Sequence, residues 1–172
     1  MKKLALFLTF SLVSLMVFAQ KKNVRKAESA LEEKNYQEAI DLIEEAVKHE
    51  KTIDKGKTWY TRGQIYQAIA FAEDETVQTI VDDPFQKAVN SFKKVEELEG
   101  ESNMQSVLAG QSLNEIWSMM LNKGATDYQE GNYEEAVKAF DKTKVVRPND
   151  TTGYIYAGVA ALQDGNYENA AA

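Results

Sequence analysis

The residues best suited to chemistry are a histidine and its acidic neighbour. His49 is the only histidine of the chain and follows Glu45 by four residues. On one helix these side chains would lie a turn apart and could share a proton or a metal ion. A metal site needs further ligands, which the nearby sequence does not offer. We therefore expect a solvated helix end with an i,i+4 pair, and a metal or proton-relay site is the alternative.

The second ionisable cluster is an acidic segment between two expected helices. Its members are Glu73, Asp74, Glu75, Asp82 and Asp83. A calcium site is one interpretation of these carboxylates, but the glycine and the alternating oxygen ligands of an EF-hand loop are missing. We therefore expect a solvent-exposed loop. The helix after it should begin with Asp83 as its cap and Pro84 in its first turn.

Other catalytic constellations are missing from the sequence. It has no cysteine, no second histidine and no glycine-rich phosphate-binding loop. The chain has 20 basic and 27 acidic residues and a net charge of −7, which argues against binding to nucleic acid or anionic lipid. We expect no catalytic residues, no metal site and no cofactor, and hence a protein that is not an enzyme.

The elements that would position any site are amphipathic helices, as residues 121–148 illustrate. Gly124 leaves a point without a side chain on a first helix, and Gly131 interrupts the periodicity. A second helix follows with apolar residues three to four positions apart, namely Tyr133, Ala136 and Phe140. We expect Asn132 and Glu135 to form a capping box. Gly124 should face Ala136 where the two helices touch.

The pattern of this second helix occurs three more times. The corresponding residues are Tyr36, Ala39, Ile43 and Ala46, then Phe85, Ala88, Phe92 and Val95, and finally Tyr167 and Ala170. Tyr133 and Tyr167 are 34 residues apart, the length of a tetratricopeptide repeat. First-helix residues recur as Trp59, Gly63 and Tyr66 and as Tyr154 and Gly158. The chain thus resembles an exported bacterial member of the tetratricopeptide repeat (TPR) family.

This resemblance implies an all-α fold, a right-handed α-solenoid of antiparallel helix pairs. The units would cover residues 20–53, 56–100 and 103–150, with an incomplete unit at 151–172. Residues between 100 and 117 keep helical spacing, so the third unit should have a lengthened first helix instead of a loop. The chain departs from the family pattern in the first helices, at Asn23, Met120, Asp127 and Ala161.

Residues 1–19 have the character of a secretory signal peptide. Two lysines precede an apolar run, and Val17 and Ala19 are small residues where a signal peptidase reads them. The run is shorter than a membrane-spanning helix requires. We expect cleavage after Ala19, export to the periplasm or beyond, and no membrane insertion of the mature repeat domain at 20–172. An uncleaved N-terminal anchor is the alternative.

In proteins of the family that this chain resembles, the first helices of successive repeats line a concave groove that binds an extended peptide or a helix. Transferred to this sequence, the groove residues are Tyr60, Gln64, Gln67, Asn122, Ala125, Tyr128, Gln129, Thr152, Ile155, Tyr156 and Val159. Amide and phenol groups on such a face suit recognition of a peptide backbone. The alternative is that these residues pack between neighbouring repeats.

The expected function is that of a non-catalytic scaffold of the cell envelope that binds a protein or peptide partner in this groove. The alternative is an accessory TPR module, placed before the enzymatic or transport-related domain of a longer envelope protein. Since the last unit stops inside its second helix, we expect the chain to be the N-terminal part of a longer protein. Self-association through this open last repeat is a further alternative.

Overall fold

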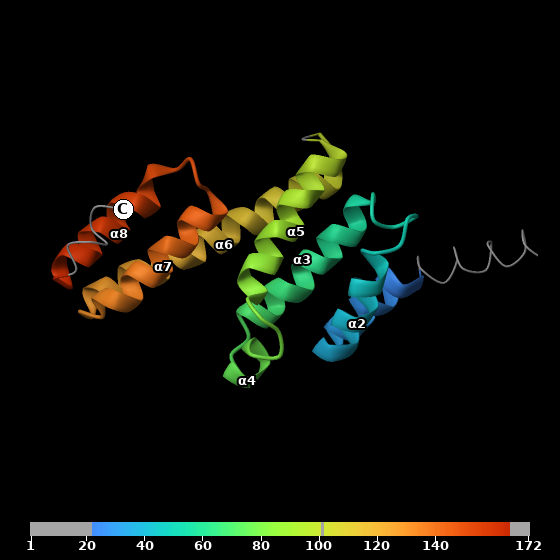
Figure 1. The fold of residues 1–172 in the computed structure, drawn as a ribbon, viewed down its shortest axis with the longest axis horizontal. Coiled ribbons are helices and arrows are strands. Elements are labelled where there is room, and N and C mark those ends of the chain that lie inside the picture. The colour runs from blue at the N-terminus through green and yellow to red at the C-terminus, as the bar shows by residue number, and fades with distance from the viewer. Residues whose placement is uncertain (1–21, 101, 166–172) are drawn as a thin grey trace, which may run out of the picture. The chain divides into compact units, whose positions relative to one another are not determined.

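The structure is a computed structural model that describes residues 22–100 and 102–165. Within these residues it contains helices and no strand (Figure 1). The helices are residues 22–32, α2 (Tyr36–Ala46), α3 (Gly56–Ala70), α4 (Glu75–Gln78), α5 (Pro84–Glu99), α6 (Met104–Gln129), α7 (Tyr133–Val146) and α8 (Thr151–Gln163). The all-α fold is confirmed. The predicted signal peptide, Tyr167 and Ala170 lie outside the described residues.

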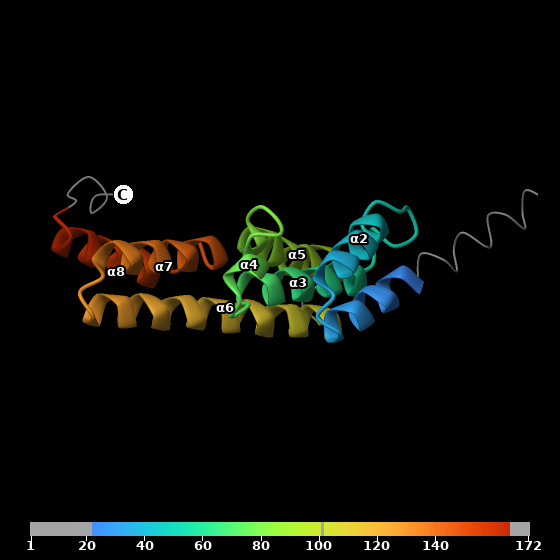
Figure 2. The same ribbon diagram turned by 90° about the horizontal axis from the view of Figure 1, so that it is seen from below.

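The chain forms two compact units, of which the first ends at Ala109 and the second begins at Gly110. α6 supplies residues to both, because it is one continuous helix of 26 residues (Figure 2). The sequence indicated a lengthened helix in this part of the chain, and α6 has that form.

In the first unit, α3 packs against both α2 and α5. α3 and α5 are antiparallel, since Gly56 at the start of α3 contacts Glu99 at the end of α5. Midway along the pair, Gly63 faces the Phe92 ring, and a Cβ atom added at Gly63 would lie only 2.5 Å from Cε1 of Phe92. The glycine therefore allows the two helices to approach. The largest fully buried side chains of this unit are Ile43, Ile65, Tyr66, Ile69 and Phe92.

The acidic segment is exposed as predicted, but it also contains the short helix α4. Asp74 caps α4, because its Oδ1 accepts hydrogen bonds from the hydroxyl (2.7 Å) and the amide (2.9 Å) of Thr76. These bonds lower the pKa of the Asp74 carboxyl. α5 begins as the sequence predicts, with Pro84 in its first turn and the Asp83 carboxylate accepting the Gln86 amide at 3.0 Å.

The predicted pair of Glu45 and His49 is wrong. α2 ends at Ala46, so these residues do not occupy successive turns of one helix. Glu45 instead accepts a hydrogen bond from the Asn23 amide at 3.0 Å, which ties α2 to the helix at 22–32. His49 lies in the turn after α2, where its Nδ1 accepts the Lys51 amide at 3.2 Å.

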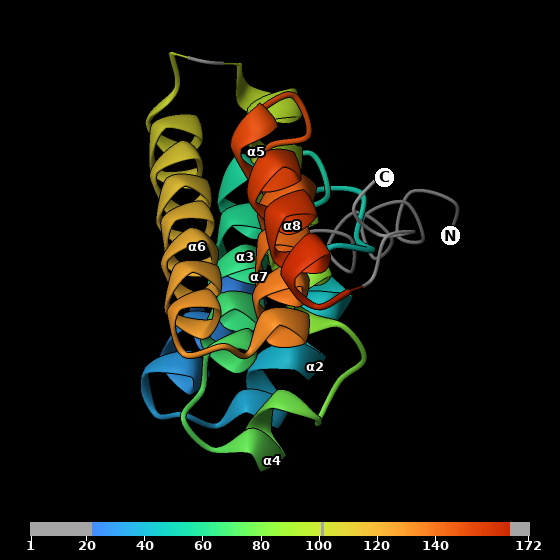
Figure 3. The same cartoon turned by 90° about the vertical axis from the view of Figure 1, so that its left-hand side faces the viewer.

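In the second unit, α7 packs against α8 and also against the C-terminal half of α6 (Figure 3). A Cβ atom on Gly124 of α6 would lie 2.5 Å from Cε1 of Phe140 in α7. The nearest atoms to Gly124 thus belong to Phe140, one turn beyond the predicted partner Ala136. Both α7 residues belong to a buried cluster with Ala157 and Ala160 of α8.

The predicted capping box at α7 is also wrong, although the turn itself lies where the sequence indicated. Gly131 has a φ of +82°, which suits glycine, and α7 begins at Tyr133. Asn132 has a ψ of 64°, outside the extended region typical of capping residues, and its side chain makes no cap hydrogen bond. Its amide instead donates to Glu130 at 3.3 Å, and Glu135 pairs with Lys138 at 2.9 Å.

Candidate functional site

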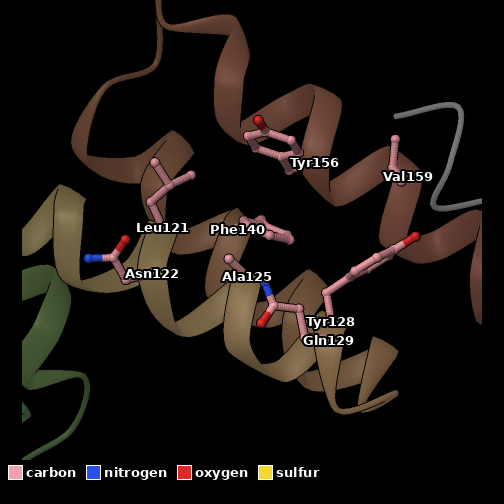
Figure 4. A pocket seen from close by; sticks show the side chains of 8 residues that line it. All are labelled: Leu121, Asn122, Ala125, Tyr128, Gln129, Phe140, Tyr156 and Val159. Carbon is pink, nitrogen blue, oxygen red and sulfur yellow. The ribbon is translucent and has the colours of Figure 1, made fainter.

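The second unit contains a pocket of about 350 Å³ between α6, α7 and α8, which we call the α6–α8 pocket (Figure 4). Its lining residues are Leu121, Asn122, Ala125, Tyr128, Gln129, Phe140, Tyr156 and Val159. The five residues from α6 occupy positions 121, 122, 125, 128 and 129, so Ala125 lies three or four positions from each of the others and all five share one face of the helix. The sequence periodicity of α6 therefore builds one whole wall of the pocket.

Aromatic rings form the inner surface of the α6–α8 pocket. Phe140 is only 3 % exposed, and the centroid of its ring lies 5.5 Å from that of Tyr156. Tyr128 extends from α6 toward Val159 on α8 (Figure 4). The Tyr128 ring is held from outside by an edge contact with Tyr133, with the centroids 5.3 Å apart. Such contacts fix the rings before any ligand arrives.

The mouth of the α6–α8 pocket combines exposed apolar surface with neutral hydrogen-bonding groups. Tyr156 is 48 % exposed and Val159 is 41 % exposed, so α8 presents apolar surface at the mouth. Asn122, Ala125 and Gln129 are exposed on α6. None of the described residues that line the pocket is a carboxylate, lysine or arginine. This lining can therefore bind an apolar group and hydrogen-bond a neutral polar one.

Most of the predicted groove residues of the second unit line this pocket. All four from α6 do so, and so do Tyr156 and Val159 from α8. Thr152 and Ile155 do not. Thr152 lies in the first turn of α8, where its amide is bound by the capping residue Asp150 at 2.9 Å, and Ile155 is 59 % exposed away from the lining.

The predicted groove residues of α3 lie in the first unit and do not line this pocket. Tyr60, Gln64 and Gln67 are half-buried. The Tyr60 ring lies against Phe92, with centroids 5.7 Å apart, so part of its surface is used within the helix pair of α3 and α5.

Sequence reasoning missed two lining residues, Leu121 and Phe140. Leu121 could have been found from spacing, because it precedes Ala125 and Tyr128 by four and seven positions on the same helical face. Phe140 was assigned to the core alone. Its ring is buried, yet one side of it forms the inner surface of the pocket, and no sequence pattern separates these two roles.

The first unit holds the best-connected ionisable cluster among the described residues. The Glu44 carboxylate of α2 accepts hydrogen bonds from Arg62 Nε at 2.7 Å and from the Tyr66 hydroxyl at 2.8 Å. Arg62 also donates to the Ser91 hydroxyl of α5 at 2.6 Å. Burial, with the hydrogen bond to Glu44, raises the pKa of Tyr66 well above its usual value. The cluster connects three helices. Its ionisable groups form hydrogen bonds with one another.

Neither cluster raised by the sequence forms a metal site within residues 22–100 and 102–165, where no three acidic or histidine side chains are grouped to hold an ion. None of the helices in the described part of the chain combines the length and apolar character needed to span a bilayer.

Comparison of the chain with protein-family models and with curated protein sequences gives no significant match.

Proposed function

We propose that this protein is a non-catalytic interaction scaffold that binds an extended segment of another protein in the α6–α8 pocket. The observation that carries the proposal is the neutral, aromatic-lined pocket with exposed amides on one wall. Tyrosine provides rigid contact area at a low cost in conformational entropy, and side-chain amides can hydrogen-bond a peptide backbone.

The arrangement of the lining suggests how a segment would bind. An apolar side chain of the ligand would enter between Tyr128 and Tyr156 and rest on Phe140. Asn122 and Gln129 lie two helical turns apart on α6, about 10 Å along the helix axis. About three residues of an extended chain span that distance, so these amides would bind the main chain on either side of the anchored side chain. Charged side chains of the ligand would find no oppositely charged partner among the described lining residues.

We further propose that the helix pairs are TPR-like repeats stacked as a right-handed solenoid. Support comes from a contact that recurs in two pairs: Gly63 faces Phe92 as Gly124 faces Phe140, with the same 2.5 Å distance from an added Cβ to the ring. The signal-like residues 1–19 support export and a site of action in the cell envelope.

The peptide-binding proposal can be tested with phage-displayed random peptides. Wild-type protein should enrich peptides that contain a bulky apolar or aromatic residue and few charges. Replacing the exposed Ala125 by leucine would fill the pocket without changing a core residue, and should weaken binding of a selected peptide by at least about tenfold.

The matched control is Ser118→Leu, because Ser118 is also exposed on α6 but does not line the pocket. It should bind the selected peptide as the wild type does, and both variants should unfold at the wild-type temperature. Equal binding by Ala125→Leu and wild type, or no enrichment of any peptide, would remove the α6–α8 pocket as the binding site.

A further inference from the structure

The first unit contains a second pocket, of about 330 Å³, whose lining differs sharply in charge from that of the α6–α8 pocket. We call it the basic pocket. Four segments meet there: the helix at 22–32, the turn between α2 and α3 with the first turn of α3, the end of α5 and the start of α6. The lining residues are Val24, Arg25, Lys51, Thr52, Lys55, Lys57, Thr58, Glu99 and Gln105.

Three of the four described cationic side chains that line the basic pocket have no acidic partner among residues 22–100 and 102–165. Arg25, Lys51 and Lys55 form no ion pair with any residue in 22–100 or 102–165. Lys57 is paired with Glu28 at 3.2 Å. The chain as a whole has seven more acidic than basic residues. A pocket lined by unpaired cations therefore has the opposite charge to the protein as a whole.

Glu99 is the one carboxylate among the described lining residues, and both of its oxygens already accept hydrogen bonds. Glu99 Oε1 accepts the Gly56 amide at 2.7 Å, and Oε2 accepts the Asn103 side-chain amide at 3.0 Å. Glu99 thereby caps the first turn of α3 and forms no ion pair with the lysines. Asp54 lies in the same turn as Lys51 and Lys55 but does not line the pocket. The described lining of the pocket therefore has an excess of positive charge.

We propose that the basic pocket binds a small molecule that carries carboxylate or phosphate groups. A volume of about 330 Å³ falls within the range of small-molecule sites and exceeds what a single ion needs. The Arg25 guanidinium can hold an oxyanion with two parallel hydrogen bonds, while the lysines act as point charges. The chemistry of carboxylate and phosphate groups is shared at this level, and the experiment separates them.

Calorimetric titration of the purified protein with pyrophosphate and with citrate, at constant ionic strength, tests the proposal. The Lys51→Gln/Lys55→Gln variant removes two exposed charges from the lining and should bind roughly tenfold more weakly. Lys48→Gln is the matched control, because Lys48 is exposed in the same turn region and does not line the pocket. It should bind as the wild type does.

Each outcome bears directly on the basic pocket. Tighter binding of citrate assigns the ligand to carboxylates, and tighter binding of pyrophosphate assigns it to phosphates. Equal weakening in Lys48→Gln and in the double variant would show general charge attraction and overturn the proposal. Failure of both anions to bind at constant ionic strength would also overturn it.

Discussion

Tyr66 is a buried phenol that donates its hydroxyl hydrogen to a carboxylate on another helix. It is 1 % exposed, and the Glu44 carboxylate that accepts its hydrogen bond is also bound by Arg62. The Arg62 guanidinium lies 4.8 Å from the centroid of the Tyr66 ring. One aromatic side chain thus contributes apolar burial, a hydrogen bond and a cation–π contact to the same helix junction.

Replacing Tyr66 by phenylalanine should destabilise the protein at neutral pH by about 1–3 kcal/mol, because the Glu44 carboxylate loses a hydrogen bond. The difference in the free energy of unfolding between the wild type and Tyr66→Phe should then become smaller at high pH. The pKa of Tyr66 is raised in the folded state, so above about pH 10 the unfolded chain ionises first and folding loses free energy. Urea denaturation of both proteins between about pH 7 and pH 11 measures the difference.

Tyr154→Phe is the matched control, since it removes one tyrosine hydroxyl from an exposed position. If the free energies of unfolding of the wild type and Tyr66→Phe differed by the same amount across the whole pH range, the role given to Tyr66 would be contradicted.

The helix pairs depend on a glycine that faces an aromatic ring. Gly63 and Phe92 bring α3 and α5 together, and Gly124 and Phe140 do the same for α6 and α7. In the second pair the glycine has a further consequence, because Phe140 forms the inner surface of the α6–α8 pocket. The close approach of these helices and the shape of the pocket therefore have the same origin.

Replacing Gly124 by leucine should overpack the contact with Phe140 and destabilise the protein by about 1–3 kcal/mol in chemical denaturation. Adding Phe140→Ala should make room for the new side chain. The loss of stability in the double variant should then be smaller than the sum of the losses in the two single variants. Ser118→Leu, at an exposed position of the same helix, controls for the added apolar bulk. Strict additivity of the two changes would disprove the contact.

The two helix starts illustrate how far local sequence decides an element. Asp83 and Pro84 begin α5 as predicted, because the capping hydrogen bond and the fixed proline φ act within a few residues. Asn132 fails as a cap although its sequence context is equally suitable. The backbone that follows Gly131 takes a ψ unsuited to capping, and Lys138 competes for Glu135.

The chain as a whole should be processed at its N-terminus if the export proposal is correct. Cleavage after Ala19 would leave Gln20 as the first residue and remove two lysines with no acidic residue, so the mature protein would be more acidic. Mass spectrometry of protein recovered from the cell envelope measures this directly. Ala19→Trp should block cleavage, and Val17→Ala should not. An intact Met1 terminus in the wild type would support the uncleaved anchor instead.

The sequence by itself determined the helices and much of the candidate site. Apolar spacing of three and four residues is a local property, so it indicated the lengthened helix that α6 forms. Asn122, Ala125 and Gln129 were expected on a binding face only because the sequence resembles the TPR family. The glycines and aromatic residues of the helix pairs were also identified from the sequence, although the register of Gly124 on Phe140 was not.

Only the tertiary structure decided what lies opposite each face. It placed Tyr156 and Val159 across from α6, and it used the buried Phe140 as a pocket surface. It also brought Arg25 and Lys51 to the same pocket from distant parts of the sequence. Which residues come into contact depends on the angles at which the helices cross and on the distances between them. Those quantities are set by the packing of many side chains at once, which no local pattern records.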